Sequence, residues 1–191
     1  MSPVIRAKSE VGEITLRPLR YRDRKVWEEV RRFNREWLTP WEATRPAIDD
    51  QNPLPTFWAM VRQGRRDART LRTLSLGIWI NDGGKPRFIG QITLGGIVFG
   101  AHRGGYIGYW IDSRVANKGF TTAAVVALTE YGFQELLLHR IEITMRPENS
   151  ASKRVAEKAG YTFEGIRNRY LHIDGDWRDH LIFVKENPEI R

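Results

Sequence analysis

A glycine that precedes a long apolar run is the first feature of this sequence that could do chemistry. Gly119 permits a sharp turn, and Phe120, Thr121 and Thr122 then open the run. The first amides of a helix have no partner inside it, and the helix dipole adds positive potential there. We therefore expect a diphosphate site, to which Lys118 adds a charge. An ordinary strand-to-helix turn with a threonine cap remains the alternative.

Composition excludes several other kinds of site. The chain has 191 residues and no cysteine, which excludes disulfides, thiolate metal sites and cysteine-linked intermediates. The sequence contains neither a Walker A pattern nor G-x-G-x-x-G at a strand-to-helix junction. We expect no metal site, because the histidines lack ligand spacing; they are His102, His139, His172 and His180. His180 is expected to form a hydrogen bond within a sheet.

Charge and hydropathy indicate the kind of partner. Lys and Arg number 31 against 23 Asp and Glu, and the net charge of +8 favours nucleic acid, ribosome or a phosphate-rich cofactor. Four arginines recur at helical spacing between residues 62 and 69, but such a run is more often a solvated helix face than a binding patch. No N-terminal apolar segment is present, and no run approaches about 18 apolar residues. We expect a cytoplasmic protein with no membrane partner.

The elements that must position Gly119 follow from the hydrophobic periodicity. The period-2 pattern and turn residues predict seven strands, at 13–19, 71–80, 87–94, 105–112, 139–145, 161–173 and 177–185. Helices are predicted at 23–39, 55–69, 119–137 and 151–159. The apolar face of the first predicted helix consists of Val26, Trp27, Val30, Phe33 and Trp37.

This order of elements predicts an α/β fold. We expect a single domain over residues 1–191, with a mixed, mostly antiparallel sheet of about seven strands and helices on both faces. The N-terminus, about 1–12, is expected to be loose, and about 186–191 should form a tail. The Asp174-Gly175 pair suits a hairpin turn between the last two strands.

Motifs in the second half of the chain resemble a known family. Residues 146–181 read RPENSASKRVAEKAGYTFEGIRNRYLHIDGDWRDHL. This segment is similar to the RimJ and RimL branch of the GNAT acetyltransferase superfamily, which acetylates N-termini of ribosomal proteins. The shared positions are Asn149, Ser152, Gly160, Tyr161, Glu164, Gly165 and the run 174–180. The LTPWE stretch at 38–42 also resembles the RimJ branch, and the order of elements resembles the superfamily from 13 to 185.

The resemblance implies acetyl-coenzyme A as co-substrate. In the superfamily the diphosphate segment reads Arg or Gln, two free positions, Gly, one free position, then Gly or Ala. Here these positions are Ala116, Gly119 and Thr121, so only the middle glycine matches cleanly. The cofactor contacts that the resemblance implies are Trp110, Ile111, Asp112, Asn117, Lys118, Gly119, Phe120, Thr121, Thr122, Asn149 and Ser152.

Catalytic roles also follow from the resemblance. Backbone amides around residues 110–112 would hold the pantetheine arm and polarise the thioester carbonyl. Ser152 would protonate the departing thiolate, and Asn149 would hydrogen-bond the cofactor arm, although both could simply cap a helix. Glu142 and Glu42 are the candidate bases. Alternatively, Glu142 forms a cross-strand ion pair and Glu42 holds the incoming ammonium group.

The sequence leaves three hypotheses about function open. In the leading one the acceptor is the N-terminal amine of a protein, such as a ribosomal protein, which attacks the thioester directly in a ternary complex because no cysteine is available. The second is a small-molecule amine, namely an amino acid, polyamine or aminated antibiotic. The third is a non-catalytic module that senses acyl-coenzyme A or docks on RNA. We expect no sequence-specific nucleic acid partner, and either a monomer or a homodimer.

Overall fold

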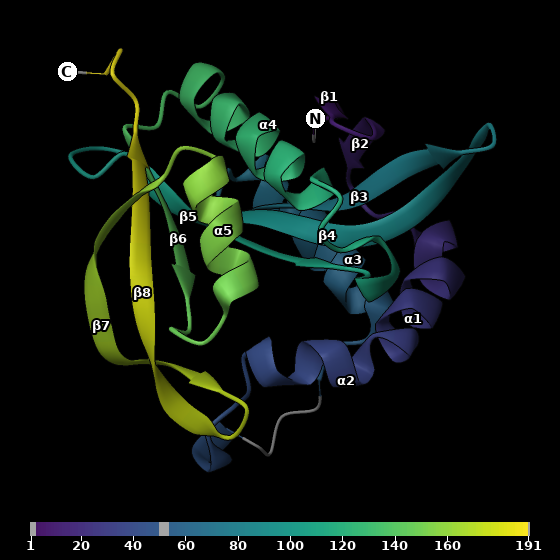
Figure 1. Ribbon diagram of the computed structural model, residues 1–191, viewed down its shortest axis with the longest axis horizontal. Helices are drawn as coiled ribbons and strands as arrows, with labels where there is room; N and C mark the ends of the chain where they lie inside the picture. The colour runs from purple at the N-terminus through teal and green to yellow at the C-terminus, as the bar shows by residue number, and fades with distance from the viewer. Residues whose placement is uncertain (1–2, 50–53, 191) are drawn as a thin grey trace.

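The computed structural model describes residues 3–49 and 54–190 and contains one eight-stranded sheet, shown in Figure 1. The strand order is β1-β2-β3-β4-β5-β6-β8-β7, and every neighbouring pair is antiparallel except β5 and β6. The predicted mixed, mostly antiparallel sheet is therefore confirmed. The strands are β1 Ile5–Ser9, β2 Gly12–Arg17, β3 Leu74–Asp82, β4 Lys85–Val98, β5 Gly104–Ile111, β6 Arg140–Met145, β7 Thr162–Ile173 and β8 Asp176–Glu186.

Helices cover both faces of the sheet. They are α1 Arg24–Phe33, α2 Arg35–Leu38, α3 Phe57–Arg69, α4 Phe120–Gln134 and α5 Ser150–Lys158, with short 3₁₀ turns η1 Tyr21–Asp23, η2 Thr39–Trp41, η3 Ala47–Asp49 and η4 Ser113–Val115. Side chains alternate along each strand, so Ile78 packs in the larger core with α4 and α5 while Trp79 packs with α1 and α3. Within the described residues, no helix has the length and apolar character needed to cross a membrane.

The N-terminal segment corrects one expectation. Residues 5–9 are not loose but form β1, whose Ile5 pairs with Leu16 of β2. Ile5 and Ala7 pack against the larger core. Only these two apolar residues alternate with polar ones in the segment, which is too short a pattern to predict a strand from the sequence. The described part of the sheet therefore has eight strands rather than about seven. At the other end Asn187 is buried, with its Nδ2 3.3 Å from the carbonyl oxygen of Leu138.

The first predicted helix is interrupted at Asn34, which lies between α1 and α2. The buried amide of Asn34 donates to the Val30 carbonyl oxygen at 2.9 Å and to Asp112 Oδ1 at 3.0 Å. Such a side chain competes with the helical backbone and bends or ends the helix. The expected apolar face is also wrong in part, because Phe33 is 58% exposed and Trp37 44% exposed.

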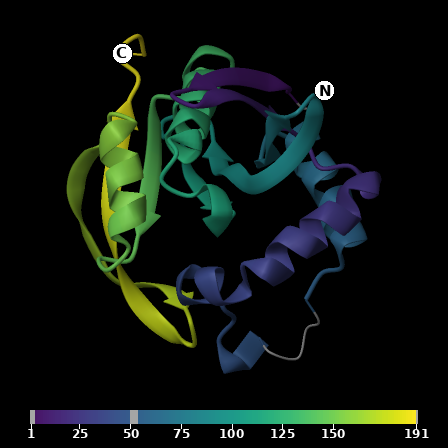
Figure 2. The same ribbon diagram turned by 45° about the vertical axis from the view of Figure 1, so that its right-hand side comes forward.

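β5 and β6 diverge after a short parallel contact. Their pairing ends at Tyr106 opposite Glu142, although β5 continues along β4 as far as Ile111 opposite Gly90. Figures 1 and 2 both show the two strands separating beyond this point. Half of the in-plane main-chain groups in the second half of β5 therefore face a gap instead of another strand. We call this gap the splay.

Candidate active site

The main-chain groups of β5 that face the splay can be assigned from the strand pairing. Asp112 donates its amide to the Ile89 carbonyl at 2.7 Å, so its polar groups face β4. Residues alternate along an antiparallel pair, which turns Trp110 toward β4 as well and turns Tyr109 and Ile111 into the splay. The expectation that the amides of Trp110 and Asp112 hold a pantetheine arm is therefore wrong. Ile111 keeps this role as a candidate, and Tyr109 joins it.

The start of α4 presents a run of free amides. Gly119 is the N-cap in the left-handed conformation, with φ of 77°, and no side chain caps the helix. Asn117 is also left-handed, with φ of 60°. Within the described chain, no amide of residues 117–122 has a hydrogen-bond acceptor. The threonine-cap alternative is wrong, and the arrangement is what an anionic diphosphate requires.

Asn149 and Ser152 have different roles at the start of α5. Asn149 Oδ1 accepts the amide of Ser152 at 3.0 Å, so Asn149 is the helix cap. The hydroxyl of Ser152 does not cap the helix. It lies 2.8 Å from the hydroxyl of Tyr109 on β5. Burial raises the pKa of Tyr109 to about 12, so the phenol stays protonated at neutral pH. A helix and a strand on opposite sides of the splay are thus joined by two hydroxyl groups.

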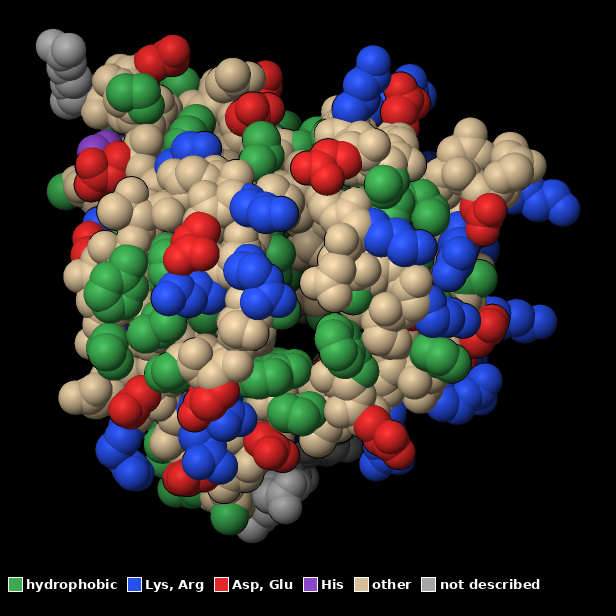
Figure 3. Space-filling view, in the orientation of Figure 1, with side chains coloured by type: hydrophobic (Ala, Val, Ile, Leu, Met, Phe, Trp, Pro, Cys, Tyr) green, Lys and Arg blue, Asp and Glu red, His purple; other side chains and the backbone are tan. Residues whose placement is uncertain are grey.

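The 38–42 stretch contacts both the end of β6 and the β7–β8 hairpin, where the Asp174 amide donates to the Glu42 carbonyl at 3.4 Å. Arg146 donates to the Pro40 carbonyl at 2.9 Å, and its guanidinium lies 5.5 Å from the ring centre of Trp41. Thr44 donates its amide to the His172 carbonyl at 2.9 Å. Figure 3 shows the molecular surface hollowed between α5 and α2, with apolar side chains around the opening. The loop and hairpin therefore meet beside the splay.

Glu42 ends η2 and is connected to β5 through an arginine. Its carboxylate forms an ion pair with Arg31, whose guanidinium is 5.2 Å from the ring centre of Trp110. The side chain of Glu42 remains 37% exposed. The carboxylate already binds one cationic side chain and stays accessible, which favours the alternative that Glu42 orients an incoming ammonium group.

Glu142 lies on β6 and contacts two arginines. Arg140 approaches its Oε1 at 3.0 Å, and Arg167 approaches its Oε2 at 3.0 Å. This double pairing favours the structural alternative, in which Glu142 links β6 to β7. His180 has the hydrogen bond expected of it, since its Nδ1–H donates to the Arg178 carbonyl at 2.9 Å.

The model of the acetyltransferase (GNAT) domain family matches residues 13–162. The chain belongs to this family. The resemblance predicted from the sequence is therefore confirmed, and acetyl transfer is the activity of this enzyme. The free amides at the start of α4 and the adjoining splay lie within the matched residues.

Known acetyltransferases align with this GNAT enzyme over about half of its length or more. The [ribosomal protein uS5]-alanine N-acetyltransferase of Escherichia coli is 28% identical over 169 residues, 87% of this chain and 85% of that one. The probable N-acetyltransferase YjcK of Bacillus subtilis is 43% identical over 103 residues, 54% of this chain and 57% of that one. The structure of Mycobacterium smegmatis RimJ in complex with CoA-disulfide superposes with a TM-score of 0.86 and 34% identity, covering 100% of this chain and 92% of that one.

Proposed function

We propose that this enzyme transfers the acetyl group of acetyl-coenzyme A to the N-terminal amine of a protein, with a ribosomal protein as the first candidate. The acceptor class is supported by the E. coli relative, which is named for an alanine of ribosomal protein uS5. Binding of the co-substrate is supported by the CoA complex of the RimJ structure. The observation that carries the proposal is the row of free amides at 117–122 beside a splay that contains the Tyr109–Ser152 pair.

The co-substrate would bind along main-chain groups. The amides at the start of α4 receive the diphosphate, and the exposed Lys118 adds a charge. The pantetheine arm enters the splay as a substitute strand beside Tyr109 and Ile111. Asn149 uses its Oδ1 as the helix cap, which leaves its Nδ2 to donate to the arm.

The reaction needs alignment and modest proton transfer. The acceptor nitrogen attacks the thioester carbonyl, the new C–N bond forms and the C–S bond breaks. Ser152 donates to the departing sulfur, and Tyr109 holds the Ser152 hydroxyl in the orientation that this requires. The sulfur gains the Ser152 proton, the amine gives up one proton to water, and water returns one to Ser152, so the reaction is balanced without any other reactant.

An N-terminal acceptor suits a site without a free carboxylate base. A free α-amino group has a pKa near 8 against about 10.4 for lysine, so deprotonation at pH 7 costs roughly 1.4 kcal/mol instead of roughly 4.6. Water can carry this proton away. We assign Glu42 to hold the ammonium group before it loses the proton, and Glu142 to hold β6 and β7 together.

The test is a direct assay of acetyl transfer. Peptides that begin with Ala or Ser should be acetylated at the α-amine, and mass spectrometry of the fragments locates the group. The same peptides with a blocked N-terminus and an internal lysine serve as control and should remain unmodified. Transfer only to free amino acids, polyamines or aminated antibiotics would replace the protein acceptor with a small molecule. A thermal shift with acetyl-coenzyme A but no transfer to any amine would support the sensing module.

A further inference from the structure

Two exposed aromatic rings lie together outside the active site. Tyr21 and Trp58 have ring centres 5.2 Å apart and are 38% and 45% exposed. Arg65 of α3 places its guanidinium 4.6 Å from the centre of Tyr21, and Arg24 of α1 lies 5.7 Å from that of Trp58. The rings and guanidinium groups therefore form one small stacked surface, built from η1, α1 and α3.

Further positive charges lie on the same three elements. Arg22, Lys25, Arg62, Arg66 and Arg69 are all exposed. Among the described residues, none of these five has a carboxylate within ion-pair distance. Figure 3 shows Lys and Arg side chains gathered along the right-hand side of the molecule, where Figure 1 places α1.

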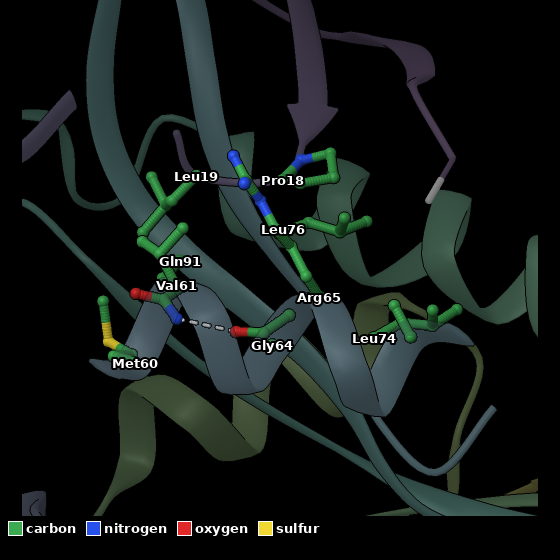
Figure 4. A pocket seen from close by; sticks show the side chains of 11 residues that line it. Pro18, Leu19, Met60, Val61, Gly64, Arg65, Leu74, Leu76 and Gln91 are labelled. Carbon is green, nitrogen blue, oxygen red and sulfur yellow. Dashed lines mark hydrogen bonds between the residues drawn. The ribbon is translucent and has the colours of Figure 1, made fainter. Parts of the chain in front are cut away.

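Two of the acidic residues on the same elements are already paired with arginines. Asp23 is buried and lies 2.7 Å from Arg17, and Glu28 lies 2.7 Å from Arg24. Arg65 extends from α3 across a cavity of about 30 Å³ toward Pro18 and Leu19, as Figure 4 shows. This path leads its guanidinium to Tyr21 instead of to a carboxylate. A solvated helix face explains the arginines of α3, but it does not explain why two aromatic rings are kept exposed among them.

We propose that this basic-aromatic surface binds single-stranded nucleic acid. Unpaired cations attract the phosphates, and unpaired bases stack on Tyr21 and Trp58 as they do on the aromatic platforms of other single-strand binders. A ring face accepts any base, so recognition does not depend on sequence. Paired bases in a duplex cannot reach the rings, which makes single strands the preferred form.

The experiment measures fluorescence anisotropy of a labelled, unstructured RNA of about 12 nucleotides, a length within the site sizes of such proteins. The affinity should fall steeply as salt is raised. Trp58→Ala and Tyr21→Ala should each weaken binding by about 5-fold or more, in line with the loss of one stacked base. Trp58→Phe keeps a ring and should restore most of the affinity.

Two controls test whether a loss of binding comes from general charge or from misfolding instead of from stacking. Lys85→Gln removes a positive charge at the exposed tip of the β3–β4 hairpin and should change the affinity less than Trp58→Ala does. Acetyl transfer and the thermal midpoint of Trp58→Ala should match the wild type, which shows that the variant is folded. Equal binding of a duplex of the same length, or an unchanged affinity in both Tyr21→Ala and Trp58→Ala, would overturn the proposal. Failure of the acetyl-transfer assay would leave it unaffected, because no catalytic residue takes part.

Discussion

The hydroxyl of Tyr109 lies 2.8 Å from the hydroxyl of Ser152 and joins β5 to the first turn of α5. Because Asn149 already caps the helix, Ser152 is left to this contact. The phenol, which also lies 3.3 Å from the Ser152 carbonyl oxygen, restricts the directions in which the serine hydroxyl can point. The pair therefore places an oriented donor in the gap through which the thioester must pass.

Replacing Tyr109 with Phe should lower kcat about 10-fold, a fraction of the factor that a proton donor contributes directly. The KM for acetyl-coenzyme A should change little, since the main chain of β5 is kept. In steady-state kinetics, Tyr109→Phe introduced into Ser152→Ala should cause no further loss, because the two hydroxyls act together. Tyr161→Phe is the matched control, since it removes a buried phenol that bonds to Thr129 at 2.6 Å. Equal, additive losses in kcat for both tyrosines would contradict the positioning role.

Glu10 should weaken co-substrate binding. Its carboxylate lies 3.9 Å from where a side chain on Gly119 would begin, and both residues line a groove of about 750 Å³ between β1 and α4. A negative charge this close to the free amides repels a diphosphate. Glu10→Gln should therefore tighten acetyl-coenzyme A binding about 2- to 5-fold at low salt, an effect that 0.5 M salt removes, as the Debye length of a few ångströms implies.

Calorimetric titration checks this prediction. Glu13→Gln is the control, because it removes an exposed carboxylate from the same hairpin and should leave the affinity unchanged. Weaker binding by Glu10→Gln would mean that the carboxylate supports the loop instead of opposing the diphosphate.

The sequence was sufficient where a local pattern decides the structure. Gly119 and the apolar run behind it predicted the free amides at the start of α4, and the Asp174-Gly175 pair predicted the β7–β8 turn. The family motif predicted Ser152, although it left the side chain equally able to cap the helix. These features depend on backbone conformation or on residues a few positions apart.

The sequence was insufficient where long-range pairing decides. The register of β5 with β4 decides which β5 amides face the splay. It turns the amides of Tyr109 and Ile111 into the splay and those of Trp110 and Asp112 toward β4. Within GYIGYWID, Tyr109 is indistinguishable from a core aromatic residue. The break at Asn34 likewise depends on Asp112, which lies 78 positions further along the chain. A pattern of apolar residues carries no information about such a partner.

His180 should make the free energy of unfolding depend on pH. Burial lowers the pKa of His180 below its usual 6.5, and the Arg146 guanidinium lowers it further. The unfolded chain therefore binds a proton more readily than the folded chain. The contribution is fully present above about 6.5 and is lost as the pH falls from there through the lower folded pKa. Urea unfolding at pH 7.5 and pH 5.5 should show a smaller drop for His180→Gln than for wild type.

The exposed His102 gives the control for this measurement. His102→Gln should retain the wild-type drop between the two pH values. An identical drop in His180→Gln would show that other groups cause the pH dependence.

Asp112 should be the most sensitive ionic position in the protein. Burial alone would raise the pKa of Asp112, but hydrogen bonds from Arg114 and Asn34 outweigh it and hold the pKa below 3.8. Its side chain is fully buried and is 2.7 Å from the Arg114 guanidinium. Asp112→Asn leaves these donors poorly matched and should lower the free energy of unfolding by about 2–4 kcal/mol, near the cost of breaking a buried ion pair.

The lowered pKa also sets a pH window for this residue. The stabilisation by Asp112 is present above about 3.8, the usual carboxyl value, and is lost as the pH falls through the lower folded pKa. Urea unfolding at pH 7 measures the loss in Asp112→Asn, and Asp82→Asn on the exposed hairpin should cost less than about 0.5 kcal/mol. Because Asn34 and the end of β5 both depend on Asp112, the variant should also bind acetyl-coenzyme A more weakly. A stability equal to that of Asp82→Asn would show that the network contributes little to folding.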